Sequence, residues 1–405
     1  MATALDGIKV LDLSRILAGP WATQSLADLG AEVWKVEHPV GGDDTRSWAP
    51  PAKNGVTTYY MSANRNKKSI AVDLGSERGR EIVLDLARKA DVVVENFRPS
   101  SLAKLGLTYE SLKAVNPRII HCSISGYGRG SEYASRPGYD FVLQAETGFM
   151  SITGEVEGNP MRLGVAFIDL VTGMNATSAI LAALYARRET GEGQYLDIAL
   201  HHSGLYLLAN VASGHLNMGT EPHRYGNAHP SIAPYQLFDT ADDPIALAVG
   251  NDGQFRRLCA DVLSDDVLAG DPRFATNVDR VANRTVLIET LSRAFASRTS
   301  ADLMAAMDAA GIPVGRVNTV SQAFRAPETT ARGAVVTLPH PVIGEMQAVA
   351  SPFVMSGTPV AEPAAPPLLG QHTRSILTEV LGWDDDRLAS ALNDGIVGEG
   401  TEGSV

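Results

Sequence analysis

The chain has few cysteines, no excess of basic charge and no unbroken apolar run. Its 2 cysteines, Cys122 and Cys259, lie far apart and form no Cys-x-x-Cys pair. Neither a disulfide framework nor a zinc–thiolate site is therefore expected. The most apolar stretch, residues 163–186, is interrupted by Asp169, Thr172 and Asn175. A membrane-spanning helix needs about 20 nearly unbroken apolar residues, so no membrane span is expected.

Acidic residues outnumber basic ones. The chain has 34 Lys and Arg against 46 Asp and Glu, which gives a formal net charge of −12. This sign opposes nucleic acids and anionic membrane surfaces, so neither is an expected partner. The first residues lack the basic and apolar regions of a signal peptide. Together with the low cysteine content, this favours a cytoplasmic location.

Short β-branched runs alternate with helical patterns through the first half of the chain. Strands are predicted at residues 8–13, 31–36, 69–72, 91–95, 119–125 and 195–199. Helices are predicted at residues 20–29, 76–89, 109–115 and 170–188. Strands that alternate with helices indicate an α/β fold with βαβ units and a mainly parallel sheet.

Composition suggests three segments. Residues 1–222 hold the alternating pattern and predict a large Rossmann-like domain. A loop rich in Pro, His and Gly at 223–234 marks a boundary, and 223–330 predicts a small α+β domain with its linker. Residues 331–405 contain a Pro-rich linker at 359–367 and a final helix at 373–381.

The turn after the first predicted strand contains a single glycine. Between Ser14 and Pro20 only Gly19 is present, where the dinucleotide fingerprint G-x-G-x-x-G needs three glycines. NAD is therefore not an expected cofactor. The free N–H groups at the start of the following helix still favour an anion.

Basic residues concentrate early in the chain. A solvated surface and an anion site are both open interpretations of this cluster. Asn96-Phe97-Arg98-Pro99 follows a predicted strand, where α/β proteins form their ligand crevices. A ring flanked by an amide and a guanidinium suits an adenine with nearby phosphates. The cluster consists of Arg46, Arg65, Lys67, Lys68, Arg98 and Lys104.

Asp169 follows an apolar run and opens a predicted helix. It suits a helix N-cap, for which Asp is a preferred residue. The helix dipole would also keep its carboxylate ionised, and an ionised carboxylate in an apolar pocket is a usable nucleophile. The nine histidines show no metal-ligand spacing, and no G-x-S-x-G motif is present.

Nine segments spread along the chain match one family. They are residues 5–12 (LDGIKVLD), 18–20 (AGP), 30–37 (GAEVWKVE), 66–70 (NKKSI), 95–99 (ENFRP), Asp169 with 172–173 (TG), 190–194 (TGEGQ), 310–313 (AGIP) and 367–373 (PLLGQHT). With them the chain resembles the family III CoA-transferases. The resemblance implies a large, doubly wound, CoA-binding domain formed by both chain ends, a smaller inserted domain and an interlaced homodimer.

The resemblance also implies a set of site residues. CoA or acyl-CoA is then a substrate, and no prosthetic group or metal ion is expected. Leu17, His38 and Lys104 replace a glutamine and two arginines of formyl-CoA transferase, so formyl and oxalyl groups are not the expected substrates. The implied CoA contacts are Leu17, Ala18, His38, Val72, Asp73, Leu74, Gly75, Asn96, Phe97, Arg98, Lys104 and Tyr139.

The implied reaction is reversible CoA transfer from an acyl-CoA to a free carboxylic, preferably dicarboxylic, acid. Asp169 would form a mixed anhydride and then an aspartyl-CoA thioester, with Asp140 positioning the acyl group. A sister branch, the α-methylacyl-CoA racemases, pairs an Asp with the His of a Gly-His-Asp motif. Here Tyr139 replaces that His, and a phenol that titrates near 10 is a poor base. Racemase chemistry and non-catalytic CoA binding are the alternatives.

Overall fold

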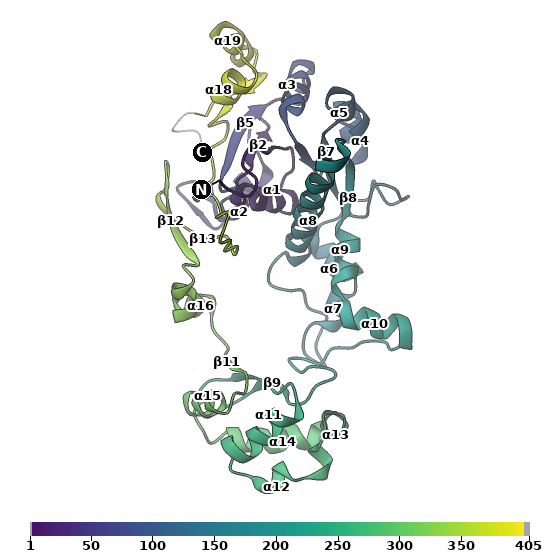
Figure 1. Cartoon of the computed structure of the whole chain (residues 1–405), viewed down its shortest axis with the longest axis vertical. Helices are drawn as coiled ribbons and strands as arrows, with labels where there is room; N and C mark the ends of the chain where they lie inside the picture. Colours follow the sequence, from purple (N-terminus) through teal and green to yellow (C-terminus); the bar gives the residue numbers. More distant parts are fainter. Residues whose placement is uncertain (1, 401–405) are drawn as a thin grey trace. The chain divides into compact units, whose positions relative to one another are not determined.

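The computed structural model describes residues 2–400, and their contacts divide the chain into two units. Unit 1 holds the described residues up to Phe149, Leu163–Ser213, and those from Glu328 onward. Unit 2 holds Met150–Arg162 and Gly214–Pro327. Figure 1 labels α1 (Ala18–Asp28) and α19 (Asp385–Asn393), which lie far apart in the sequence and both belong to unit 1.

Unit 1 is built on a seven-stranded sheet in the order β14-β5-β2-β1-β6-β7-β8. All neighbours pair in parallel except β14, which is antiparallel to β5. The predicted mainly parallel sheet is therefore confirmed. The six parallel strands follow the order of dinucleotide-binding domains, in which the winding direction reverses beside the first strand. The strands are β1 (Lys9–Asp12), β2 (Glu32–Glu37), β5 (Lys67–Val72), β6 (Val92–Glu95), β7 (Ile120–Ser125), β8 (Tyr195–Ala199) and β14 (Val397–Gly398).

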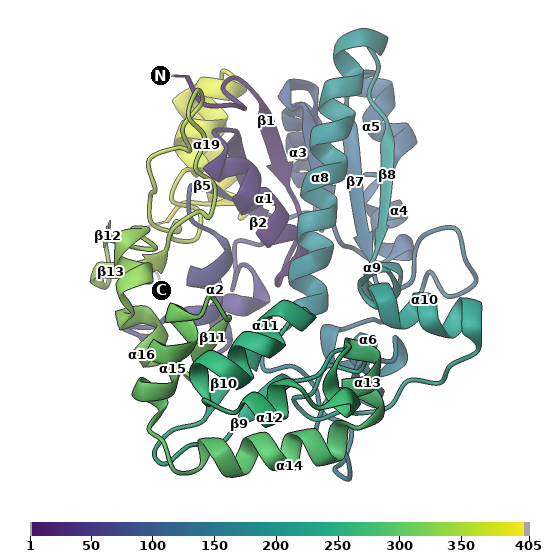
Figure 2. The same ribbon diagram turned by 60° about the horizontal axis from the view of Figure 1, so that its bottom comes forward.

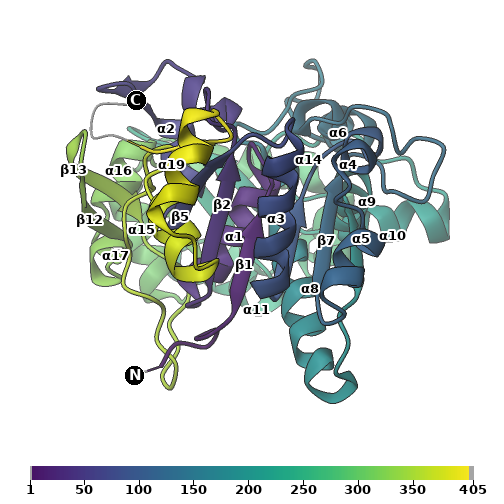
Figure 3. The same cartoon turned by 90° about the horizontal axis from the view of Figure 1, so that it is seen from above.

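Helices cover both faces of this sheet, so its strands are apolar on both sides. On one face α1 (Ala18–Asp28) and α8 (Phe167–Thr190) share a core with the sheet that includes Val10, Val92 and Ile180. On the other face the core includes Trp34 and Leu86, together with Leu377 and Leu388 from the C-terminal segment. In Figure 3 helices α3 and α19 lie in front of the strands. The helices that contribute to this second core are α3 (Glu77–Lys89), α4 (Pro99–Leu105), α5 (Tyr109–Val115), a π-helical turn (Ile376–Val380) and α19 (Asp385–Asn393). The short helix α18 (Thr373–Ser375) leads into the π-helical turn.

Two predicted helices begin earlier than expected. Helix α1 starts at Ala18, ahead of Pro20, and α8 starts at Phe167, three residues before the predicted 170. Proline tolerates the first turn because its missing N–H has no intrahelical partner there. Shorter elements complete unit 1: β3 (Ala52–Lys53), β4 (Val56–Thr57), α2 (Thr58–Ala63), α4 (Pro99–Leu105), α6 (Asp140–Glu146), α9 (Leu200–Leu207), β12 (Val335–His340) and β13 (Gly344–Val349).

Helix α8 is the one helix among residues 2–400 that is long and apolar enough to span a membrane by composition alone. It packs against α1 and along β7 and β8, as Figure 2 shows, which is the setting of a core helix. The cytoplasmic location stays a prediction.

Unit 2 has its own antiparallel sheet in the order β11-β10-β9 and its own core around Phe255, Leu291 and Phe295. Met150–Arg162, within the range 1–222 expected for the large domain, belongs to this unit. Arg224 holds that segment through the carbonyls of Glu155 and Gly158. The principal elements are β9 (Tyr235–Phe238), β10 (Ile245–Ala248), β11 (Val314–Arg316), α11 (Asp252–Arg257), α13 (Asn277–Ala282), α14 (Arg284–Phe295) and α15 (Ser300–Ala309).

Helices α1 and α8 approach each other at Gly173. A Cβ atom at this position would lie 2.7 Å from the carbonyl oxygen of Ala18. Replacing Gly173 by alanine is expected to destabilise the protein by about 1–2 kcal/mol, because overpacking outweighs the gain in helix propensity. Thermal unfolding measures the effect. The control is Gly214→Ala in α10 (Ala209–Met218), where nothing lies within 4 Å of the added Cβ. Equal melting temperatures for both variants would contradict the prediction.

Candidate active site

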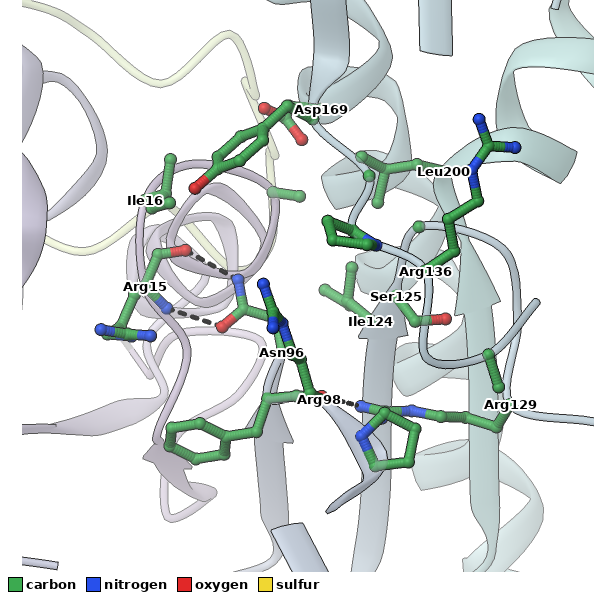
Figure 4. A pocket seen from close by; sticks show the side chains of 18 of the residues that line it. Arg15, Ile16, Asn96, Arg98, Ile124, Ser125, Arg129, Arg136, Asp169 and Leu200 are labelled. Carbon is green, nitrogen blue, oxygen red and sulfur yellow. Dashed lines mark hydrogen bonds between the residues drawn. The ribbon is translucent and has the colours of Figure 1, made fainter. Parts of the chain in front are cut away.

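The carboxyl ends of β1 and β6 are neighbours in the sheet, and the turns that follow them meet. The Asn96 side chain bonds to the main chain of Arg15 in both directions: Arg15 N donates to Oδ1 at 3.0 Å and Asn96 Nδ2 donates to the Arg15 carbonyl at 2.8 Å. Figure 4 shows both bonds. In α/β proteins of this strand order, ligands bind at this reversal point.

Two cavities open at this edge of the sheet. The Asp169 cavity has a volume of about 400 Å³ and the His38 cavity about 390 Å³. Arg15, Phe97 and Ser101 line both, so the two cavities adjoin. In Figure 4 Asp169 and Arg129 stand at opposite ends of the Asp169 cavity. Its apolar lining includes Ile16, Ile124 and Leu200.

The structure brings most of the predicted site residues to these cavities. Asp73 lines neither, but its Oδ1 lies 3.7 Å from Nε2 of His38. Asp140 lines neither cavity and is buried. Those in the Asp169 cavity are Leu17, Ala18, Asn96, Phe97, Arg98, Tyr139 and Asp169, and those in the His38 cavity are His38, Val72, Leu74, Gly75, Phe97 and Lys104. Their contact with CoA remains a prediction.

Asp169 is the third residue of α8, not its N-cap. The N-cap is Ala166, which makes no side-chain capping bond. The helix begins two residues before Asp169 because Phe167 and Ile168 already have helical geometry. The Asp169 side chain is partly buried, and within residues 2–400 its carboxylate accepts no hydrogen bond.

Asp140, the first residue of α6, caps α8 from outside. Its Oδ1 accepts the main-chain N–H of Ile168 at 2.8 Å and that of Asp169 at 3.4 Å. Its Oδ2 accepts a hydrogen bond from Gln144 Nε2 at 2.6 Å. Asp140 thus contacts the main chain that carries Asp169 and the Gln144 side chain.

Burial and, to a smaller extent, the nearby Asp140 carboxylate together raise the pKa of Asp169 to about 7. The sequence-based expectation that the helix dipole keeps Asp169 ionised is therefore wrong. The reason is that burial and the Asp140 charge both disfavour the ionised form. Asp140 also accepts the N–H groups of Ile168 and Asp169 in the first turn of the helix. Near neutral pH the group exists in both forms, which suits a carboxylate that must be both nucleophile and leaving group.

Four of the six early basic residues are not available to an anionic ligand. Arg46 bonds to Glu37, Arg65 to Asp28, Lys67 to Asp12 and Lys68 to Glu32. The first three are largely buried, so the interpretation of this group as an anion site is wrong for them. Arg98 and Lys104 line the cavities and have no ion-pair partner among the described residues.

Sequence reasoning missed three arginines of the Asp169 cavity: Arg15, Arg129 and Arg136. Arg129 donates through Nη2 to both oxygens of buried Glu95 and to the carbonyl of Phe97. It therefore fixes the turn that carries Asn96 and Phe97. The glycine-rich stretch that follows β7 is the sequence feature that could have indicated a loop at this edge of the sheet. Across residues 2–400 no group of three or more His, Cys, Asp or Glu is arranged to hold a metal ion.

Comparison with known proteins gives one consistent result. The family model for "CoA-transferase family III" matches residues 5–373. A succinate–glutarate CoA-transferase of Agrobacterium fabrum is 45% identical over 382 residues, which cover 93% of this chain and 95% of that protein. A succinyl-CoA:glutarate CoA-transferase of Homo sapiens is 42% identical, covering 97% and 90% respectively. The crystal structure of a CAIB/BAIF family protein from Brucella suis superposes with a TM-score of 0.83 at 44% identity, covering 94% of this chain and 100% of that one.

Proposed function

Because the chain belongs to CoA-transferase family III, we propose that it transfers CoA from succinyl-CoA, or a similar donor, to a free dicarboxylic acid. The similar proteins named above act on succinate and glutarate, which supports a dicarboxylic acceptor. The observation that carries the proposal is the Asp169 carboxylate, which has no hydrogen-bond partner within residues 2–400 and lines a cavity at the strand ends.

The chemistry proceeds by covalent catalysis at Asp169. An Asp169 carboxylate oxygen attacks the donor thioester carbonyl, the C–S bond breaks, and a mixed anhydride and a CoA thiolate form. The thiolate attacks the Asp169 carboxyl carbon, the anhydride C–O bond breaks, and the donor acid leaves. An aspartyl-CoA thioester remains. The acceptor carboxylate then reverses both steps and departs as the new acyl-CoA.

Each tetrahedral intermediate carries a negative oxygen that needs hydrogen-bond donors. Helix geometry leaves the N–H groups of Ala18 and Gly19, at the start of α1, without intrahelical acceptors. Ala18 lines the Asp169 cavity, and a Cβ atom at Gly173, one turn after Asp169, would lie 2.7 Å from the Ala18 carbonyl oxygen. The N–H of Ala18 is the proposed oxyanion donor, because Gly19 lines neither cavity. Asp140 holds the first turn of α8, a helix that packs against α1.

Arg98 and Lys104 are proposed to bind the CoA phosphates. Replacing Arg98 by glutamine is expected to raise KM for succinyl-CoA about tenfold and to leave kcat within twofold, because one charge-assisted contact is lost in ground and transition states alike. Steady-state kinetics at low ionic strength measure this. Arg88→Gln on α3 is the control, since Arg88 is also exposed but lines neither cavity. Equal KM values for the two variants would contradict the assignment.

The interlaced homodimer is also part of the proposal. An apolar groove of about 1070 Å³ runs beside α1, α8 and β13 in unit 1. Its lining includes Trp21, Met174, Leu181, Met346 and Phe353. A groove of this size favours burial against another protein surface. Sedimentation equilibrium of the full chain is expected to give twice the monomer mass, and a monomer at micromolar concentration would contradict the proposal.

A carboxylic-acid panel tests the function itself. The protein is incubated with succinyl-CoA and one acid at a time, and new thioesters are detected by mass spectrometry. The proposal expects a new thioester with a dicarboxylic acid of four to six carbons. Deuterium entering the α-carbon of a 2-methylacyl-CoA without an acceptor acid would instead show racemase chemistry. CoA binding without either reaction would show a non-catalytic module.

A further inference from the structure

The turn between β1 and α1 contains a strained residue. Ile16 has φ of +73°, in the left-handed region that a β-branched side chain rarely adopts. Its side chain lines the Asp169 cavity, and Figure 4 shows it on the α1 side of that cavity. Such a conformation persists only when surrounding contacts impose it.

From Ser14 N to Ile16 N, every main-chain N–H and carbonyl group of this turn forms a hydrogen bond with a side chain. Ser14 N donates to Asp12 Oδ1 at 3.0 Å, and the Ser14 carbonyl accepts from Lys35 Nζ at 3.0 Å. The N–H and carbonyl of Arg15 both bond to Asn96. Ile16 N donates to the two oxygens of Asp43, at 3.3 Å each. The turn is therefore fixed before any ligand arrives.

Lys35 and Asp43 form the centre of this arrangement. Their side chains are fully buried, and Lys35 Nζ lies 2.9 Å from Asp43 Oδ2. Asp43 also accepts hydrogen bonds from the Thr45 main chain at 3.0 Å and the Thr45 hydroxyl at 2.8 Å. The Asp43 carboxylate is thus held in one position. A different backbone conformation at Ile16 would break the hydrogen bonds from Ile16 N to this carboxylate. Lys35 donates to the Ser14 carbonyl, and Asp43 accepts from the Ile16 N–H.

We propose that Lys35 and Asp43 are positioning residues for the reaction. By holding Ile16 in its left-handed conformation they set the start of α1, and hence the N–H group of Ala18, which lines the same cavity as Asp169. This inference rests on the proposed function. Lys35 lines neither cavity, and Asp43 lines the His38 cavity but has a fully buried side chain. The proposal therefore predicts that the pair acts through the turn.

The first variant is Asp43→Asn, which keeps the shape of the side chain and removes its charge. It is expected to lower kcat about tenfold, because the weakened acceptor no longer holds Ile16 at positive φ. Adding Ile16→Gly is expected to restore most of this kcat, since glycine adopts positive φ without the steric conflict of a Cβ atom. If Asp43→Asn does not fold, the double variant Lys35→Gln with Asp43→Asn takes its place. This double variant removes both charges of the buried pair, so no unpaired charge is left.

The matched control is Asp28→Asn. Asp28 is also buried and paired with an arginine, Arg65, but lies at the opposite end of α1. This variant is expected to lose stability and keep kcat. All kinetics are measured well below each variant's melting temperature. An unchanged kcat in Asp43→Asn, or a lowered kcat that Ile16→Gly does not restore, would overturn the proposal.

Amide hydrogen exchange separates this proposal from the proposed function. Exchange at residues 15–18 is expected to be at least tenfold faster in Asp43→Asn than in wild type and unchanged in Asp28→Asn. If the wild type transfers no CoA, the proposed function fails while this measurement still decides whether the pair fixes the turn. Unchanged exchange at these residues would refute the positioning role.

Discussion

Replacing Asp169 by asparagine is expected to lower kcat for CoA transfer by about 10⁴-fold while the Kd for succinyl-CoA changes by less than threefold. An amide cannot attack the thioester, so neither the anhydride nor the aspartyl thioester forms. The cavity keeps its shape because the Asp169 side chain accepts no hydrogen bond among the described residues. Single-turnover kinetics and calorimetric titration measure the two constants.

Trapping identifies the residue that carries the intermediate. Hydroxylamine added during turnover is expected to convert the aspartyl thioester to a hydroxamate on the peptide that contains Asp169, and only in the presence of acyl-CoA. Asp140→Asn is the matched control, because it removes the neighbouring carboxylate and leaves the nucleophile. That variant should still be labelled. Label on another residue, or full activity in Asp169→Asn, would refute the mechanism.

Asp169→Asn is also expected to stabilise the fold at alkaline pH. Unfolded Asp169 ionises at its ordinary pKa of 3.8, whereas burial raises the folded pKa to about 7. Folding therefore becomes less favourable as the pH rises from about 4 to about 7, and the penalty stays constant above that. Asp169→Asn removes the penalty, so its melting temperature should exceed that of wild type at pH 8, with a gain that shrinks toward pH 4.

Transferase activity is expected to fall about 100-fold between pH 7.5 and pH 5. The nucleophile must be ionised, and the pKa of Asp169 lies at about 7. Below this value the logarithm of kcat/KM should fall with a slope of one per pH unit, and above it the profile should be flat. The dependence of kcat/KM on pH for succinyl-CoA measures the pKa of the free enzyme.

Asp140→Asn supplies the control for this profile. The Asp140 carboxylate is the second cause of the raised pKa of Asp169, after burial. Removing its charge should shift the inflection to lower pH while the asparagine oxygen can still accept the N–H of Ile168. An inflection that stays in place would show that Asp140 does not act on Asp169, and a rising activity toward acid would refute the ionised nucleophile.

The alternating strand and helix pattern was enough to predict the parallel sheet, because buried parallel strands are continuous β-branched runs such as Val92–Glu95. Asp169 was found as a carboxylate after an apolar run. The pairing of Lys67 with Asp12 was not predictable, since it joins side chains 55 residues apart that only the sheet brings together. For the same reason the capping of α8 by Asp140 left no local signal, and the raised pKa of Asp169 was missed.

Antiparallel pairing of β14 with β5 has a consequence for synthesis on the ribosome. Strand β5 is complete at Val72, but its outer edge gains its partners only when the C-terminal segment has been made. Ser69 and Ala71 bond to His372 and Thr373, and β14 pairs with Ala71 and Val72. During that interval the edge exposes free main-chain groups, and such edges recruit other chains. The intervening unit 2 has a core of its own and can fold first. Chaperone demand should therefore peak late in translation and depend on how quickly the nascent C-terminal segment docks.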